Sequence, residues 1–426
     1  MLTSILAALR LPDLRKRILF VFGMFAVFVV GLHIPVPGID RDAMGKLFSQ
    51  GGILGMVDVF SGGALRKFTI FAMGIAPYIT ASIIMQLLTV AVPSLEALAK
   101  EGEHGRKKIS QYTRYMTVIL AAFQAAGMNN LLAKMGVLHV TPFMFIEITI
   151  TLTAGTAFLM WVGEQITDKG IGNGVSLVIF AGIVASLPFQ IGNTIEFVRA
   201  GSIKPHQVVM LATLFVGTIV AIVAIQQAQR KIPIQHVKRV VGNKMYGGST
   251  SFLPLRVNSA GVIPIIFALS IQFLPLTAAQ FVGQGSDLGR RIYDLAMWFT
   301  PGANIWASLL YVLLIVLFTY FYTAVTFNVP EVADNLKKYG SFIPGIRPGK
   351  PTLEYLDKVM SRITLAGAVF LSIIALMQYW APLITQVRTF SLVGGTSLLI
   401  VVGVALETMQ AMEAHLLMRH YEGFIK

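Results

Sequence analysis

Long apolar runs separated by short polar segments make up most of this chain. A membrane-spanning helix needs about 20 apolar residues, and we count about ten runs of that size. They lie at roughly 18–34, 68–92, 111–133, 142–164, 174–194, 206–228, 259–281, 304–328, 360–384 and 391–413. The runs are apolar on all sides, whereas the strands of a lipid-facing barrel would alternate. The pattern therefore predicts an all-α polytopic membrane protein with ten transmembrane helices.

Two short strings occur twice, each time inside an apolar run. Residues 74–79 are echoed by residues 261–266, and residues 174–179 are echoed by residues 395–400. Because the helices alternate in direction, each echo pairs helices that run in opposite directions. This predicts two inverted five-helix halves, residues 1–199 and 200–426. Chance similarity of short apolar strings is the alternative. Each echo ends on an isoleucine rather than on a charged residue, which favours an apolar constriction over an ion site.

The distribution of the charged residues along the chain predicts its orientation in the membrane. Only 13% of the residues are charged, yet the net charge is +14. Lys and Arg concentrate on the segments that are cytoplasmic if the N-terminus is cytoplasmic, so the positive-inside rule places both termini there. Two long basic loops, about 229–258 and 329–359, then face the cytoplasm and suit an acidic or nucleic-acid partner. Alternation at Ile232 and Ile234 predicts a hairpin in the first loop.

The stretch 50–67 is moderately apolar, too short to span a bilayer, and flanked by glycine pairs. Backbone that is not helical is tolerated at membrane depth only inside protein or a water-filled cavity. We therefore expect this stretch to fold back into a cavity from outside, the alternative being an ordinary surface loop. Prolines 77, 188, 264, 275 and 382 are expected to kink their helices.

Residues with catalytic or metal-binding chemistry are missing where they would be needed. The chain has no cysteine, and it has neither an HExxH motif nor a Walker A loop. Ionisable residues are nearly absent near helix centres, which disfavours an ion or proton pathway. We therefore predict no enzymatic activity, no cofactor and no metal. Gln86, Gln124 and Asn258 are uncharged polar residues that either serve as packing contacts or meet as a latch between the halves.

Many ordered strings resemble the SecY family, the central subunits of the bacterial Sec protein-conducting channel, over nearly the whole chain. They are residues 34–40, 60–65, 77–83, 108–115, 163–167, 170–174, 333–338 and 342–349. So many strings in the same order make the resemblance specific.

The resemblance implies an hourglass of ten helices with an aliphatic ring at its waist. Carried over by motif, the ring residues are Ile75, Ile79, Val175, Ile179, Ile263, Ile266 and Ile400. Residues about 52–64 resemble the family's plug, with apolar side chains at Ile53, Leu54, Met56, Val57, Val59 and Phe60. A lateral gate of helices 2 and 3 against 7 and 8 would carry Thr80, Gln86, Gln124, Asn258 and Leu274. Motor or ribosome docking would use Lys238, Arg239, Lys244, Arg347 and Lys350.

The implied function is a channel that passes unfolded polypeptides and releases apolar segments sideways into lipid. Its implied partners are the membrane subunits SecE and SecG, the SecA ATPase, the ribosome, signal peptides and unfolded secretory or membrane proteins. Its implied location is the bacterial inner membrane. The main alternative is a secondary transporter of small solutes, which shares inverted repeats but needs a polar midplane site. A scaffold that only holds partners would leave the re-entrant stretch unexplained.

Overall fold

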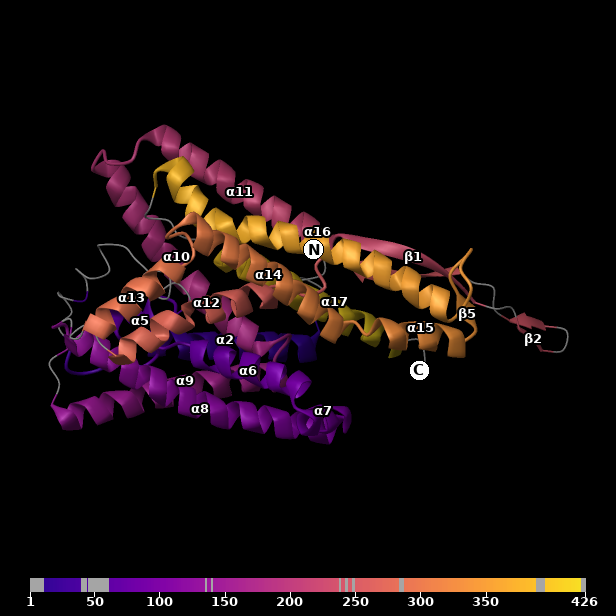
Figure 1. The fold of residues 1–426 in the computed structure, drawn as a ribbon, viewed down its shortest axis with the longest axis horizontal. Coiled ribbons are helices and arrows are strands. Elements are labelled where there is room, and N and C mark those ends of the chain that lie inside the picture. The colour runs from indigo at the N-terminus through magenta and orange to yellow at the C-terminus, as the bar shows by residue number, and fades with distance from the viewer. Residues whose placement is uncertain are drawn as a thin grey trace.

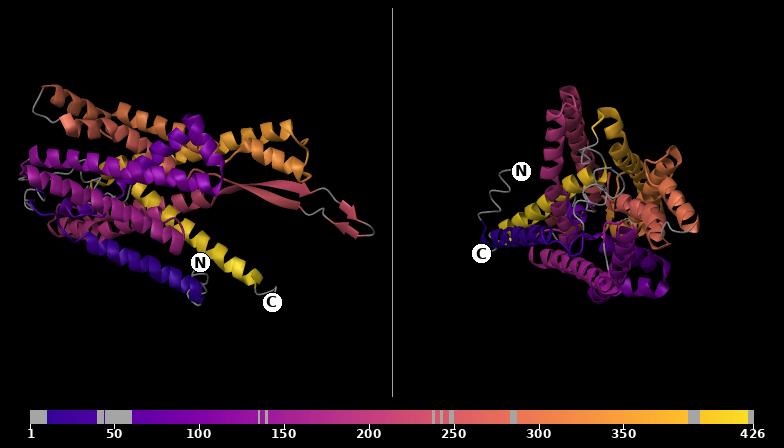
Figure 2. Two further views of the ribbon diagram at one scale, coloured as in Figure 1. Left: turned by 90° about the horizontal axis from the view of Figure 1, so that it is seen from below. Right: turned by 90° about the vertical axis from the view of Figure 1, so that its left-hand side faces the viewer.

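The computed structural model describes residues 11–39, 44, 61–134, 136–138, 141–236, 239–241, 244–246, 250–282, 287–387 and 395–422. It is an elongated helical bundle with a small sheet projecting from one end (Figure 1). Helices of the first half of the chain lie along one side of the bundle. Helices α11, α14 and α16 of the second half lie along the other (Figure 1). Figure 2 shows the short strands at the tip of this end reaching beyond the helices.

Each predicted apolar run overlaps a helix. In the first half these are α2 (Pro12–Gly31), α6 (Ala76–Ala91), α8 (Glu103–Lys134), α9 (Pro142–Lys169) and α10 (Gly174–Arg199). In the second half they are α11 (Pro205–Gln227), α12 (Ile263–Val282), α14 (Ile305–Thr326), α16 (Lys350–Thr385) and α17 (Thr396–Glu422). Shorter helices are α5 (Ala64–Lys67), α7 (Pro93–Lys100), α13 (Asp287–Phe299) and α15 (Val329–Lys338).

Length and composition give fewer membrane-spanning helices in the described residues than the ten predicted from the sequence pattern. Within the described ranges, seven helices are long and apolar enough to cross a membrane. The count is eight if α6 and α7, which meet at 98°, form one broken span. Helix α2 carries the basic triplet Arg15–Arg17 in its early turns, and the apolar stretch of α12 is short. Ten spans in two inverted halves therefore remain a prediction.

The structure corrects the prediction for two of the prolines. Pro188, Pro275 and Pro382 lie inside α10, α12 and α16, as expected. Pro77 and Pro264, however, are the second residues of α6 and α12. A proline is tolerated in the first helical turn because its missing N–H has no helical partner there. These two residues start their helices and do not kink them.

The two long loops meet in one antiparallel sheet of order β4–β1–β5. Strands β1 (Gln229–His236) and β4 (Thr250–Arg256) form the predicted hairpin, with Ile232 and Ile234 buried. Strand β5 (Ser341–Phe342) comes from the second loop and pairs with the end of β1. Strands β2 (Arg239–Val241) and β3 (Lys244–Tyr246) form a separate pair. The second loop is more ordered than the sequence suggested, because α15 lies in it and α16 begins at Lys350 rather than near 360.

Candidate functional site

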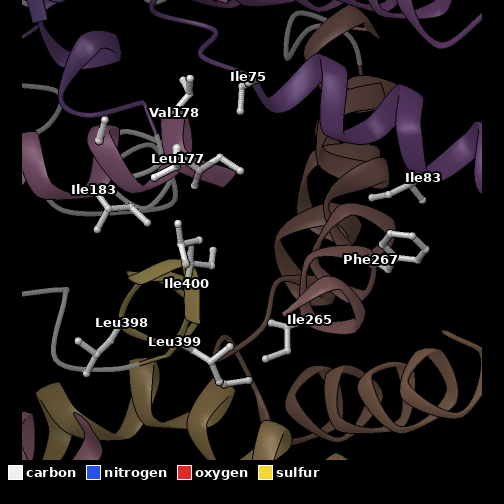
Figure 3. Packing of buried hydrophobic residues seen from close by; sticks show 14 of the residues in the cluster. Ile75, Ile83, Leu177, Val178, Ile183, Ile265, Phe267, Leu398, Leu399 and Ile400 are labelled. Atoms are coloured by element: carbon white, nitrogen blue, oxygen red, sulfur yellow. The ribbon is translucent and has the colours of Figure 1, made fainter. Parts of the chain in front are cut away.

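Four helices begin at one hydrophobic cluster in the bundle. Their first residues are Ala76 of α6, Gly174 of α10, Ile263 of α12 and Thr396 of α17. The cluster contains buried side chains from the start of each of these helices. Figure 3 shows Ile75, Leu177 and Ile400 approaching one another from three of them. Side chains from four helix starts therefore meet in one buried cluster.

A glycine in the left-handed region precedes each of these helix starts. The φ angles are +55° at Gly74, +80° at Gly172, +64° at Gly261 and +91° at Gly395. Glycine adopts this conformation without the steric cost that a Cβ atom brings. The turn redirects the chain just before the helix begins, which gives a physical reason for three of the four echoed glycine positions. In the remaining string, 174–179, the left-handed residue is Gly172, two positions before the echoed Gly174.

The structure brings all seven predicted ring residues to this cluster. Ile75, Ile179 and Ile400 are buried members of it. The partly buried members that pack against it are Ile79, Val175, Ile263 and Ile266. Sequence reasoning did not single out Leu177, Val178, Ile265, Leu398 and Leu399, which are also buried here. They neighbour the ring residues in sequence. Finding them would have required the expectation that the whole first turn of each helix is buried.

The side chains of the cluster are apolar, and its electrostatics come from the backbone. Aliphatic groups offer no dipoles to replace the hydration shell of an ion, so a narrow passage among them loses its water. The N-terminus of a helix carries the positive end of the helix dipole, equivalent to about half a charge. Four helix starts contribute side chains to the cluster. These side chains offer no polar group that could replace the hydration shell of an ion.

The described end of the predicted plug, and Arg66 just after it, lie against α10. A Cβ atom at Gly62 would lie 2.9 Å from the backbone oxygen of Gly182. The Arg66 guanidinium lies over the Phe189 ring, with Cζ 3.3 Å from the ring centroid. The predicted plug side chains themselves, Ile53, Leu54, Met56, Val57, Val59 and Phe60, lie outside the described residues.

Comparison with known proteins identifies the family. The family model described as SecY matches residues 69–409 of this chain. The chain belongs to the SecY family. The protein translocase subunit SecY of Vibrio cholerae serotype O1 is 46% identical over 424 residues, which cover 98% of this chain and 95% of that protein.

Solved structures share the fold of this SecY-family chain. One, described as showing that the plug domain of SecY stabilises the closed state and maintains a membrane seal, matches with a TM-score of 0.64 at 18% identity. Another is Sec61 in the canine ribosome-channel complex from the endoplasmic reticulum, with a TM-score of 0.60 at 16% identity. Each alignment covers 94% of this chain and 92% of the other. The relatives and the fold support the channel interpretation and not the small-solute transporter.

The helices of the gate predicted from the SecY resemblance are neighbours in the structure. Helix α12 packs against both α8 and α14, and α6 packs against α8. The predicted polar gate residues do not form a latch. The Thr80 hydroxyl donates to the Ala76 carbonyl at 3.1 Å, and Gln86 Nε2 donates to Ser82 Oγ at 3.4 Å, both within α6. Asn258 Nδ2 donates to the Gly261 carbonyl at 3.2 Å.

The two remaining residues of the predicted gate make none of these local hydrogen bonds. Gln124 is half-buried in α8, and Leu274 is largely exposed on α12. A buried amide that the sequence analysis missed lies on the same helix as Leu274. Gln272 is 3% exposed, and its Nε2 donates to the carbonyls of Phe299 at 2.7 Å and Ala307 at 2.9 Å. A lone glutamine inside an apolar run is the signal that could have found it.

The predicted docking residues of this SecY-family chain lie at the sheet end of the molecule. Arg347 and Lys350 are exposed, the latter at the first residue of α16. Arg239 and Lys244 belong to β2 and β3, at the far tip of the molecule (Figure 1). Lys238 lies outside the described residues.

Proposed function

We propose that this chain is the channel-forming subunit of a protein translocase. Unfolded polypeptides cross the membrane through the aliphatic cluster where α6, α10, α12 and α17 begin, and apolar segments leave sideways between α12 and α8. The observation that carries the proposal is the convergence of these helix starts on one cluster of aliphatic side chains. Membership of the SecY family supports it.

The proposed topology has ten spans in two inverted halves, residues 1–199 and 200–426, with both termini in the cytoplasm of a bacterial cell. The chain lies in the inner membrane and performs no chemical step itself. Energy comes from partners that dock on the basic loops, the SecA ATPase or a translating ribosome. SecE and SecG are the proposed membrane partners. A ribosome-bound channel among the structural neighbours supports the ribosome as a partner.

The cluster acts as a seal because it has no group that replaces ion hydration. Replacing Ile79, Ile179 and Ile266 together with glycine should therefore raise ion conductance in planar bilayers. Glycine weakens any helix by about 1 kcal/mol, so the matched control replaces the exposed Ile150, Ile195 and Ile373 with glycine. Unchanged conductance in the ring variant, or an equal rise in the control, would refute the seal.

Docking of the motor is tested separately. Arg347 is exposed at the sheet end, and reversing its charge with Arg347→Glu should weaken ATP-driven translocation while leaving membrane insertion of the subunit intact. Arg291→Glu makes the same charge change in α13, at the opposite end of the molecule (Figure 1). It should leave translocation unchanged. Normal translocation by the Arg347 variant would contradict the docking role.

A further inference from the structure

His236 joins three strands that come from the two cytoplasmic loops. Its Nδ1 lies 2.8 Å from Ser341 Oγ of β5, and its Nε2 lies 3.0 Å from Ser251 Oγ of β4. A hydroxyl can donate or accept a hydrogen bond. Both bonds can therefore form at the same time with either tautomer of the ring. One side chain of β1 thus links the first loop to the second.

The position of His236 on β1 follows from the alternation of the strand. Ile232 and Ile234 point to the buried face, and His236 continues the same face at the end of the strand. Ser341 is buried as well. The backbone pairing between β1 and β5 is short, comprising Gln235 with Phe342 and His236 with Ser341. Because the backbone pairing of β5 is short, the side-chain bond of His236 adds to an attachment that otherwise rests on two paired residues and on the packing of Ile343.

Strand β5 leads directly to Arg347. Ile343, just after β5, is buried in a small core shared by both loops and α16. The Ile346 N–H donates to the Ile343 carbonyl at 3.0 Å, and Thr352 Oγ1 donates to the Arg347 carbonyl at 2.8 Å. The segment with Arg347 is therefore held at one end by β5 and at the other by the first turn of α16.

We propose that His236 is a positioning residue that couples the two loops into one docking surface for the ATPase motor. The proposal rests on the docking function proposed above. Without the His236 bonds, β5 is held to β1 less tightly, and Arg347 is less firmly fixed relative to the first loop. The motor then has to order two loops that move more freely relative to each other, and the free-energy cost of ordering them weakens its binding.

The first test measures ATP-driven translocation by the full translocase against motor concentration. His236→Ala should raise the motor concentration needed for half-maximal rate on the order of fivefold, as expected for losing the one hydrogen bond that joins the two loops. The maximal rate at saturating motor should be retained, since the channel is untouched. Ser341→Ala removes the link to β5 from the other partner and should have a similar effect with little risk to folding. Wild-type half-saturation in both variants would overturn the proposal.

The second test restores the link by covalent means. Directly paired residues of antiparallel strands have Cα atoms about 4.5–5.5 Å apart, within the range of a disulfide. Gln235→Cys with Phe342→Cys, added to His236→Ala in this chain without cysteines, should restore half-saturation when oxidised and lose it when reduced. Pro233→Cys with Phe252→Cys, which joins β1 to β4 only, should not restore it. Failure of the oxidised 235–342 pair to rescue would overturn the coupling role.

A distance measurement separates this inference from the docking proposal. Spin labels at Phe252→Cys and Tyr339→Cys, both exposed, should give one narrow distance distribution that broadens with His236→Ala. If the distribution broadens but Arg347→Glu translocates normally, the coupling stands and the docking proposal fails. If Arg347→Glu impairs translocation but the distribution stays narrow with His236→Ala, only the coupling fails.

Discussion

The contact between Arg66 and Phe189 should bias the channel toward its resting state. Arg66 lies just after the predicted plug, and its guanidinium stacks on the Phe189 ring of α10. If the plug leaves its resting place when a polypeptide enters, this contact is broken in the conducting state. Phe189→Leu keeps an apolar side chain of similar size but removes the aromatic face, and so weakens only the resting state.

The size of the effect follows from the exposure of the contact. Phe189 is 45% exposed, and a cation–π contact at an exposed site contributes about 0.5–1 kcal/mol. At about 1.4 kcal/mol for a tenfold change, the ratio of conducting to resting channels should rise about two- to fivefold. Phe189→Trp should keep the resting state or strengthen it, because tryptophan is the best partner for a cation.

The assay is the fraction of time that single channels conduct in planar bilayers. The control is Phe197→Leu, which makes the same change at another exposed phenylalanine of α10. An open fraction for Phe189→Leu equal to that of the control would refute the reasoning. An increase with Phe189→Trp as large as with Phe189→Leu would also refute it, since it would show that the aromatic face does not matter.

Two further predictions concern packing and buried polarity. A Cβ atom at Gly174 would lie 1.9 Å from the Gly163 carbonyl oxygen, so Gly174→Ala should push α10 from α9 and cost about 1–3 kcal/mol. Thermal unfolding in detergent measures this, with Gly192→Ala of the same helix as a control because no atom lies within 4 Å of the added carbon. Gln272→Leu removes the bonds from α12 to the Phe299 and Ala307 carbonyls, and should cost about 1–2 kcal/mol at roughly 0.6 kcal/mol per membrane hydrogen bond plus an unpaired carbonyl. A melting temperature equal to wild type would contradict the assigned role of this amide.

Apolar periodicity was enough to predict where helices lie but not where they begin. The run 68–92 predicted a helix from residue 68, yet α6 starts at Ala76, because the residues before it form turns that include the left-handed Gly74. The run from 391 likewise precedes a helix that starts at Thr396, after Gly395. Hydrophobicity measures burial, and the turn residues before α6 are as buried as the helix that follows. The glycines carry the information on boundaries that hydrophobicity lacks.

The polar contacts were harder to predict because they depend on tertiary neighbours. His236 was one of several histidines in loops or at helix ends, and nothing in the sequence around it indicates Ser341, whose position is 105 residues away. The amides Gln86 and Asn258 suggested a latch, but each bonds locally because an acceptor is available within four residues. A local bond orders fewer groups than a contact across helices, so it costs less conformational entropy and is favoured.

The repeated strings share a local cause, the left-handed glycine before a helix start. Each of the four helix starts needs a left-handed turn, and glycine meets that need at Gly74, Gly261 and Gly395 in equivalent echo positions. Proline follows three residues later at Pro77 and Pro264, where it fits the first helical turn. The glycine and the proline could arise independently in each string, because any left-handed turn followed by a helix favours them. Such a turn does not require an isoleucine at the end of every string, however, so the shared isoleucines argue for a constraint beyond the turn. That constraint is satisfied if these side chains face one another across a common constriction, as the cluster at Ile79, Ile179, Ile266 and Ile400 permits.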